Sequence, residues 1–336
     1  MGIYQQFLSP DSKHYPIPFW FWNDDLQPDH LVWQMEQMHE QHIHEVFIHA
    51  RRGLTVAYLS DEWMNRIELT VKTAERLGMK VWLYDEENFP SGYAGGRVTQ
   101  KNPELLGKHV KLIPVSPEAA ISTDGKILGG YFDDNGRKSF IPADKIPTDF
   151  NTTKHVLELI VLRTTKWHPA YSEDYYVDVL HPETGKTFIE VTHEVYRERF
   201  GKYFGNIIKG FFTDEAGLYN NLKLRGLSDP EDDDSLPWTA VLPEVFQKKN
   251  GYELLPVLYK LWEQSDDASG KIKHDFYETI CDLYVENFLD PQRKYCEKYN
   301  MEFVGHLHME DYLFEQASAQ CNFARAQAAL SWGGTD

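Results

Sequence analysis

The sequence predicts an α/β fold of the (β/α)8 barrel type, truncated after about five β/α units and carrying an inserted β-rich subdomain. Short apolar runs alternate with segments of helical spacing, which is typical of a parallel sheet with helices outside. Several of these runs end in charged residues, as barrel strands do where they reach a site. An open five-stranded sheet is the alternative.

The first three β/α units are expected within residues 1–106. A helix from about Pro28 to His42 has apolar residues at a spacing of three to four. A second helix is expected between Ser60, a residue type that caps helix N-termini, and Gly78, a type that ends helices. Three strands precede and follow these helices, at 17–22, 45–49 and 80–84.

The alternation stops over residues 107–181, where period-two segments and turns at Asp124-Gly and Asn135-Gly predict the inserted β-rich subdomain. It resumes over 182–336, but the chain stops where a sixth strand is expected. We therefore expect a barrel that is not completed within this chain. Strands are expected at 209–215 and 302–311, and helices at about 188–204, 243–261, 273–299 and 314–330.

Composition narrows the class of protein. The formal charge of −18 repels phosphate backbones and anionic lipid, so neither nucleic acid nor membrane is an expected partner. The N-terminus lacks the pattern of a signal peptide, which favours a cytoplasmic location. Three cysteines without CxxC spacing predict neither disulfides nor structural zinc. No organic cofactor is expected, and the oligomeric state is left open.

Acidic residues stand at the ends of the third and fourth predicted strands. Asp85, Glu86 and Glu87 follow the third strand, and Asp214 and Glu215 end the fourth. Because the carboxyl ends of barrel strands meet at one mouth, these groups are expected to converge. Converging carboxylates suggest glycosidic or proton-transfer chemistry. The three adjacent acids after the third strand repel one another, so sugar hydroxyls or a bound cation are expected to stabilise them.

Two glutamates suit the two roles of a glycosidase. Glu215 is the first choice for the general acid, and Glu310, near the end of the fifth strand, is the best candidate for the general base. Strand alternation places Glu215 on one face with Phe211 and Thr213, and Asp214 on the other. Inversion requires carboxyl groups about 6.5–9.5 Å apart, and retention about 5 Å. An ordinary ion pair with arginine is the alternative for each glutamate.

The fifth strand also brings two histidines to this end. Alternation places His306, His308 and Glu310 on one face. Sugar binding is the preferred interpretation of the histidines, a satisfied hydrogen-bond network is the second, and an H-x-H metal pair is the third.

Further sugar-binding residues are expected at the ends of the first two strands. Trp22 and Asn23 end the first, and His49 and Arg51 end the second. Calcium, which prefers several oxygen ligands, is the expected metal if Glu86 and Glu87 bind one. The acidic loop 229–234 lacks EF-hand spacing and is interpreted as solvated.

Four segments resemble the α-L-rhamnosidases of glycoside hydrolase family 106. They are Pro18-Phe-Trp-Phe-Trp-Asn23, Tyr84-Asp-Glu-Glu-Asn-Phe-Pro-Ser-Gly92 with Ala94-Gly-Gly96, Phe212-Thr-Asp-Glu215 and Gly305-His306. The resemblance implies a (β/α)8 catalytic domain, a calcium-assisted site and inversion by two glutamates. Family members are usually longer, with later barrel strands and β-sandwich modules.

Carried over by position, Glu215 ends the fourth strand as a catalytic glutamate would. Glu310 is its expected partner, while Glu86 or Glu87 stays open for that role. The predicted function is therefore an inverting, α-L-rhamnosidase-like glycoside hydrolase acting on plant or bacterial glycans. The alternatives are a retaining β-galactosidase-like glycosidase, a barrel that only binds carbohydrate, and a metal-dependent hydrolase that uses His306 and His308.

Overall fold

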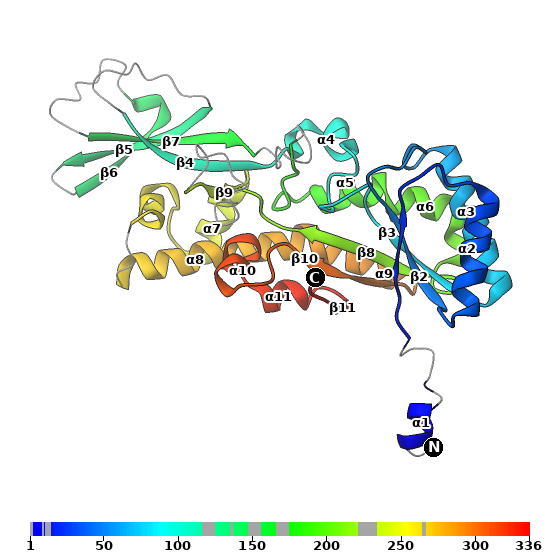
Figure 1. Ribbon diagram of the computed structural model, residues 1–336. Coiled ribbons are helices and arrows are strands. Elements are labelled where there is room, and N and C mark those ends of the chain that lie inside the picture. The colour runs from blue at the N-terminus through cyan, green and yellow to red at the C-terminus, as the bar shows by residue number, and fades with distance from the viewer. Residues whose placement is uncertain are drawn as a thin grey trace.

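A six-stranded parallel sheet and a five-stranded antiparallel sheet form the two parts of the fold (Figure 1). The computed structural model describes residues 3–8, 10, 15–115, 125–134, 137–146, 156–165, 175–220, 234–263 and 267–336. The two turns predicted at Asp124 and Asn135 lie outside these ranges, as does most of the acidic loop 229–234.

The parallel sheet has its strands in the order in which they follow along the chain, as a barrel requires. It forms a half-barrel, so the closed (β/α)8 barrel stays a prediction. The count of five strands was one too low, because a two-residue strand pairs with the fifth at Val304 and Gly305. The strands are β1 Phe19–Trp22, β2 Glu45–Ala50, β3 Lys80–Tyr84, β8 Ile208–Ala216, β10 Glu302–Leu307 and β11 Trp332–Gly333.

Helices cover the outer face of this sheet (Figure 1). The second of them, α3 (Asp61–Leu77), begins and ends at the predicted residues: the Ser60 hydroxyl accepts the Trp63 N–H at 3.2 Å, and Gly78 closes the helix with φ 71°. Trp63 packs edge-on against Trp22, and its indole N–H donates to Tyr196 Oη at 2.9 Å. The core between sheet and helices therefore includes Trp22.

Several long helices predicted from the sequence are interrupted in the structure. The segment around 243–261 divides at Gly251 (φ 82°), and the last helix divides at Cys321 (φ 62°), because a left-handed residue cannot continue a right-handed helix. In the segment predicted as one helix at 273–299, a short π-helix at Val285–Leu289 lies between α8 and α9. The α-helices are α1 Ile3–Leu8, α2 Pro28–Glu40, α4 Arg97–Lys101, α5 Thr184–Val191, α6 His193–Phe200, α7 Leu242–Asn250, α8 Asp267–Tyr284, α9 Asp290–Lys298, α10 Leu313–Gln320 and α11 Phe323–Gln327. Within the described ranges, none has the length and apolar character needed to span a bilayer.

The antiparallel sheet has the strand order β6-β5-β7-β4-β9. Four of its strands fall in the segment predicted to be β-rich, and β9, which follows the fourth barrel strand, joins the edge of β4. The subdomain is thus tied to the half-barrel through a later part of the chain. Its strands are β4 Lys108–Pro114, β5 Lys126–Asp134, β6 Arg137–Pro142, β7 Val156–Thr164 and β9 Leu236–Trp238.

The inner face of the half-barrel is aromatic. Phe47, Trp82, Tyr84 and Phe212 form a buried cluster with Val304, separate from the core that the helices cover. Since side chains alternate along a strand, the residues two positions after these lie on the same face, nearer the carboxyl ends. Polar groups therefore emerge above an apolar floor.

Replacing Gly210 by alanine is expected to disturb the pairing of β8 with β10, which positions these polar groups. A Cβ there would lie 2.0 Å from the carbonyl oxygen of Glu302 and 2.8 Å from the Trp82 ring. Overpacking of this kind costs about 1–3 kcal/mol. Gly270→Ala is the matched control, because a Cβ in that part of α8 meets nothing within 4 Å. Urea unfolding that gives the two variants equal stability would contradict this tight strand contact.

Candidate functional site

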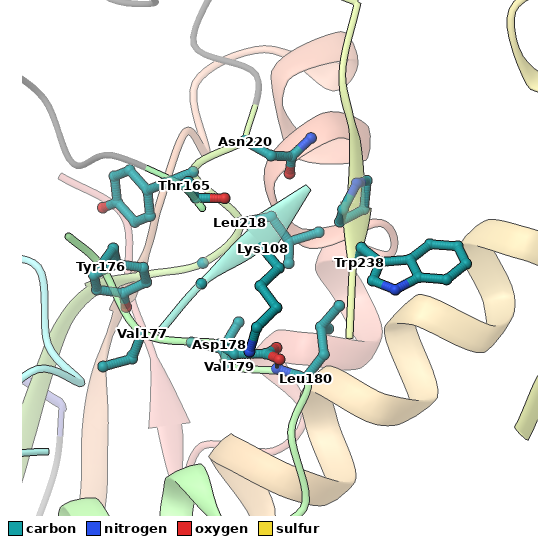
Figure 2. A pocket seen from close by; sticks show the side chains of 14 residues that line it. Lys108, Thr165, Tyr176, Val177, Asp178, Val179, Leu180, Leu218, Asn220 and Trp238 are labelled. Atoms are coloured by element: carbon teal, nitrogen blue, oxygen red, sulfur yellow. Dashed lines mark hydrogen bonds between the residues drawn. The ribbon is translucent and has the colours of Figure 1, made fainter. Parts of the chain in front are cut away.

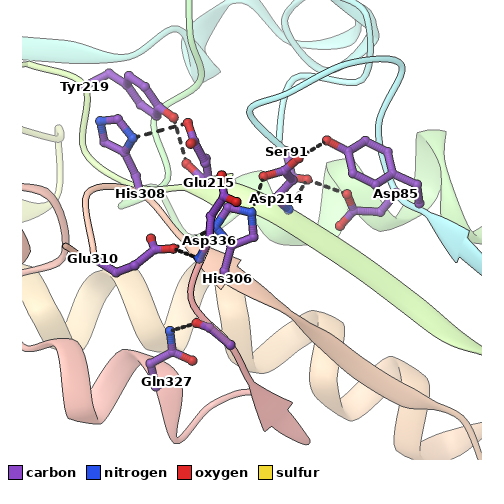
Figure 3. A network of polar contacts seen from close by, with 12 residues as sticks. Asp85, Ser91, Asp214, Glu215, Tyr219, His306, His308, Glu310, Gln327 and Asp336 are labelled. Atoms are coloured by element: carbon purple, nitrogen blue, oxygen red, sulfur yellow. Dashed lines mark hydrogen bonds and ion pairs between the residues drawn. The ribbon is translucent and has the colours of Figure 1, made fainter. Parts of the chain in front are cut away.

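Asp214 links the carboxyl ends of three neighbouring strands (Figure 3). Tyr84, the last residue of β3, donates its hydroxyl to Asp214 Oδ2 at 2.5 Å, and His306 Nε2 of β10 lies 2.8 Å from Oδ1. Only 7% of Asp214 is exposed. The predicted convergence of strand ends therefore occurs, with Asp214 at its centre.

His306 bridges two carboxylates, because its Nδ1 also lies 3.0 Å from Glu310 Oε1. Burial by itself lowers the pKa of His306, but the hydrogen bonds to Asp214 and Glu310 outweigh it and raise the pKa to about 10. Burial would raise the pKa values of the two acids, yet the hydrogen bonds from His306 lower both. At neutral pH the three groups form an imidazolium between two carboxylates.

The turn after β3 is locked to the end of β8 by Ser91. Its hydroxyl donates to Asp85 Oδ1 at 2.5 Å and accepts the Asp214 N–H at 2.8 Å, while its own N–H donates to the Asp214 carbonyl at 2.7 Å. Burial raises the pKa of Asp85 well above its usual range, and the Ser91 hydrogen bond only partly opposes this. Asp85 therefore supports Asp214 through Ser91.

Glu86 is fully buried and shapes the loop that follows β3. Its carboxylate accepts N–H groups at 2.6–3.2 Å, so both oxygens are occupied. Burial raises the pKa of Glu86 to about 7, although these hydrogen bonds oppose the shift. The geometry assigns Glu86 to loop structure and leaves it no free oxygen for sugar. The five donors are Glu87, Gly92, Tyr93, Ala94 and Gly95.

Calcium stays a prediction for this protein, but Glu86 and Glu87 do not suit it as ligands. The Glu86 oxygens are taken by amides, and the Glu87 carboxylate points to Arg97, with 3.8 Å between Oε2 and Nη1. In the part of the chain that the structure describes, no group of three or more His, Cys, Asp or Glu side chains is arranged to hold a metal.

Glu215 departs from the predicted strand alternation. Phe211 packs against His193 on the helix side, but Glu215 has a left-handed backbone (φ 50°), which ends the regular alternation. Its Oε2 lies 3.6 Å from His308 Nδ1, and its carbonyl accepts the Tyr219 hydroxyl at 2.7 Å. Glu215 thereby joins the mouth of the half-barrel.

The predicted face of three residues on β10 is divided between two clusters (Figure 3). His306 and Glu310 contact each other, whereas His308 contacts Glu215 and stacks on Tyr219 with ring centroids 4.2 Å apart. The cause is backbone irregularity, since β10 ends at Leu307 after a register shift and Met309 is left-handed (φ 57°).

The ends of β1 and β2 form one flank of the mouth. His49 stacks on Tyr84 with centroids 3.6 Å apart, and burial lowers its pKa to about 3, so the ring is neutral. The Arg51 guanidinium lies over the rings of Phe21 and Phe89, at 5.5 and 5.0 Å. Asn23, the residue after β1, is exposed to solvent.

Trp22 does not reach this mouth, because its side chain is 1% exposed and lies in the core beneath the helices. Sequence reasoning also passed over three residues that hold the site together. Tyr84 and Ser91 lie within the recognised Tyr-Asp-Glu to Pro-Ser-Gly run, so that run was the available signal. Nothing local in the sequence marks Tyr219, whose role depends on the turn after β8.

A separate cavity of about 20 Å³ lies between the start of β4 and the segments around Asp178 and Leu218 (Figure 2). Burial raises the pKa of Asp178 to about 7 there. This space suits one water molecule and excludes a sugar ring. The mouth containing Glu215, His306 and Glu310 is the candidate site because polar side chains from several strand ends meet there.

Among solved structures, the fold is similar to that of a rhamnosidase from Novosphingobium sp. PP1Y, with a TM-score of 0.61 and 13% sequence identity. The match covers 98% of this chain and 49% of that protein, so this chain spans about half its length. No family model and no curated protein matches the sequence. The likeness establishes a rhamnosidase-like fold.

The bridge through His306 predicts a pH-dependent stability. Its folded pKa of about 10 exceeds the ordinary value of 6.5, so its contribution is fully present below about pH 6.5 and is lost as pH rises through about 10. His306→Gln should cost about 3–5 kcal/mol at pH 7, because it leaves two buried carboxylates without a cation. The exposed His274→Gln is the control. Urea unfolding curves that stay equally separated from wild type across pH 6–10 would contradict the bridge.

Glu86→Gln is expected to loosen the loop 86–95, because an amide nitrogen would face N–H donors where an oxygen now accepts them. A loss of about 1–3 kcal/mol follows from leaving buried donors unpaired. Glu87→Gln is the neighbouring control, since that side chain is 41% exposed. Hydrogen exchange at Ala94 and Gly95 should accelerate in the first variant alone, and equal protection in both would refute the loop role.

Proposed function

We propose that this chain forms part of a glycoside hydrolase of the α-L-rhamnosidase type, with Glu215 as general acid and Glu310 as general base. The observation that carries the proposal is the unlike surroundings of these carboxylates at the neighbouring ends of β8 and β10. Glu310 is buried against a cationic His306, whereas Glu215 is 25% exposed at its side chain. Glycosidases divide acid and base roles between carboxylates in unlike surroundings.

In the proposed reaction, Glu215 gives its proton to the glycosidic oxygen as the bond from that oxygen to the anomeric carbon breaks. The bonding electron pair leaves with the oxygen. Glu310 takes a proton from a water molecule, whose oxygen attacks the anomeric carbon from the opposite side. The sugar is released with inverted configuration. The low pKa of Glu310 keeps it ionised before the step, as a base must be.

The remaining groups support these two. Asp214 and His306 hold Glu310 in place, and Tyr84 and Ser91 hold Asp214. Neutral His49, Arg51 and exposed Asn23 are proposed to bind sugar hydroxyls along the β1 and β2 flank. Membership of glycoside hydrolase family 106, a closed barrel and plant or bacterial glycans as substrates belong to the same proposal.

One observation favours a second candidate, a half-barrel that binds carbohydrate without cleaving it. Glu310 Oε1 accepts two hydrogen bonds, one from His306 Nδ1 at 3.0 Å and one from the backbone N–H of Asp336 at 2.7 Å. If Glu310 keeps both of these hydrogen bonds, its carboxylate is a weaker acceptor for a proton from water. Thermal stabilisation by L-rhamnose without turnover is expected in that case.

The test is hydrolysis of nitrophenyl α-L-rhamnoside by the full chain and by Glu215→Gln and Glu310→Gln. Each substitution should lower kcat by about 10²–10⁴-fold, because it removes a proton donor or acceptor. Glu75→Gln, on the exposed side of α3, should keep wild-type turnover. Proton NMR of the first product should show the inverted anomer. A retained anomer would mean a double-displacement enzyme, and equal rates for all four proteins would remove both assignments.

The same assay addresses calcium. We derive no catalytic step through the ion, because the oxygens of Glu86 are already occupied. Turnover measured with added calcium and with a chelator should differ if other oxygen atoms of the mouth bind it. Equal rates would remove calcium from the proposal without affecting the two glutamates.

A further inference from the structure

We infer that His308 is a positioning residue for Glu215, and that Tyr219 holds the two together. This inference rests on the proposed function, since it concerns how the general acid is oriented. Three contacts carry it: the approach of His308 to the Glu215 carboxylate, the stack of His308 on Tyr219, and the hydrogen bond from the Tyr219 hydroxyl to the Glu215 carbonyl.

The imidazole of His308 is buried beside the Glu215 carboxylate, and its ring nitrogens are available for a hydrogen bond. Its Nδ1 lies 3.6 Å from Glu215 Oε2, slightly beyond hydrogen-bond distance, and the residue is 5% exposed. Among the described residues, neither ring nitrogen has a hydrogen-bond partner. A buried polar ring without partners is costly, so a small closure onto Glu215 would be favourable.

Tyr219 contacts both members of this pair. Its ring stacks on His308 with an interplanar angle of 24°, and its hydroxyl donates to the Glu215 carbonyl at 2.7 Å. The left-handed backbone at Glu215 is thereby held by a residue that also fixes the imidazole. One side chain thus sets the carboxyl group and its partner relative to each other.

The backbone keeps the two loops close. The His308 N–H points to the Ala216 carbonyl at 3.5 Å, and the His308 carbonyl accepts the Gln320 side-chain amide. At Gly217 a Cβ would come within 2.9 Å of His308 Cβ, so only glycine allows this approach. The turn after β8 therefore presents Glu215 to His308 without a side chain between them.

The consequence is an oriented acid. A hydrogen bond from the Nδ1–H tautomer of His308 to Oε2 fixes the carboxyl plane and leaves Oε1 to carry the proton to the glycosidic oxygen. The two histidines at the end of β10 then have different tasks: cationic His306 contacts Glu310, and His308, in the turn that follows the strand, orients Glu215. A displacement of a reacting group by about 1 Å can cost about 10²-fold in rate.

The kinetic test compares His308→Ala and His308→Gln with wild type, using nitrophenyl α-L-rhamnoside. The alanine variant should lose about 10–10²-fold in kcat with little change in KM, and glutamine, which keeps a donor, should recover part of it. His274→Ala, on the exposed side of α8, is the histidine control. Wild-type kcat in the alanine variant, or a loss confined to KM, would overturn the inference.

A second measurement separates this inference from the proposed function. Nitrogen NMR of the His308 ring, assigned with His308→Gln, is compared in wild type and Glu215→Gln. The ring signals should move when the carboxylate is replaced by an amide, whether or not the chain hydrolyses rhamnoside. Unchanged signals would overturn the pairing. Moved signals with no turnover by wild type would support the pairing and remove the hydrolase.

Discussion

The rest of the site depends on the hydrogen bonds that Asp214 makes. Its carboxylate accepts hydrogen bonds from Tyr84 of β3 and His306 of β10. Its backbone N–H and carbonyl both bond to Ser91, in the turn after β3. The backbone ladders set the register of β8 with both neighbouring strands. Asp214 adds side-chain links at the strand ends, because its buried carboxylate accepts hydrogen bonds from both neighbours.

The acidic residues of this mouth have opposite electrostatic surroundings although they lie close together. Asp85 and Glu86 lie where burial prevails, and their pKa values are raised. Asp214 and Glu310 touch a cationic imidazole, and their pKa values are lowered. The strongly negative chain thus holds several carboxyl groups in one region in different ways. Burial favours the neutral form of Asp85, and backbone amides surround Glu86. The cationic His306 lies between Asp214 and Glu310, which stay charged.

The aromatic floor and the β-rich subdomain bound this region from two sides. Beneath it, Phe47, Trp82 and Phe212 exclude water from the inner face of the half-barrel. Beyond it, β9 joins the edge of β4, so the segment that leaves the candidate acid returns into the subdomain.

The sequence by itself determined the parallel strand order, the cap and end of α3, and the convergence of carboxylates, since periodicity, capping residues and strand ends are local signals. Only the tertiary structure decided the surroundings of each carboxylate. Glu86 is indistinguishable from Glu87 in sequence, yet one is enclosed by five amides and the other reaches Arg97. Glu215 and His308 leave the faces that alternation predicts, because left-handed residues and a register shift end the strands there. Side-chain environment arises from residues distant in the chain, and no local pattern encodes it.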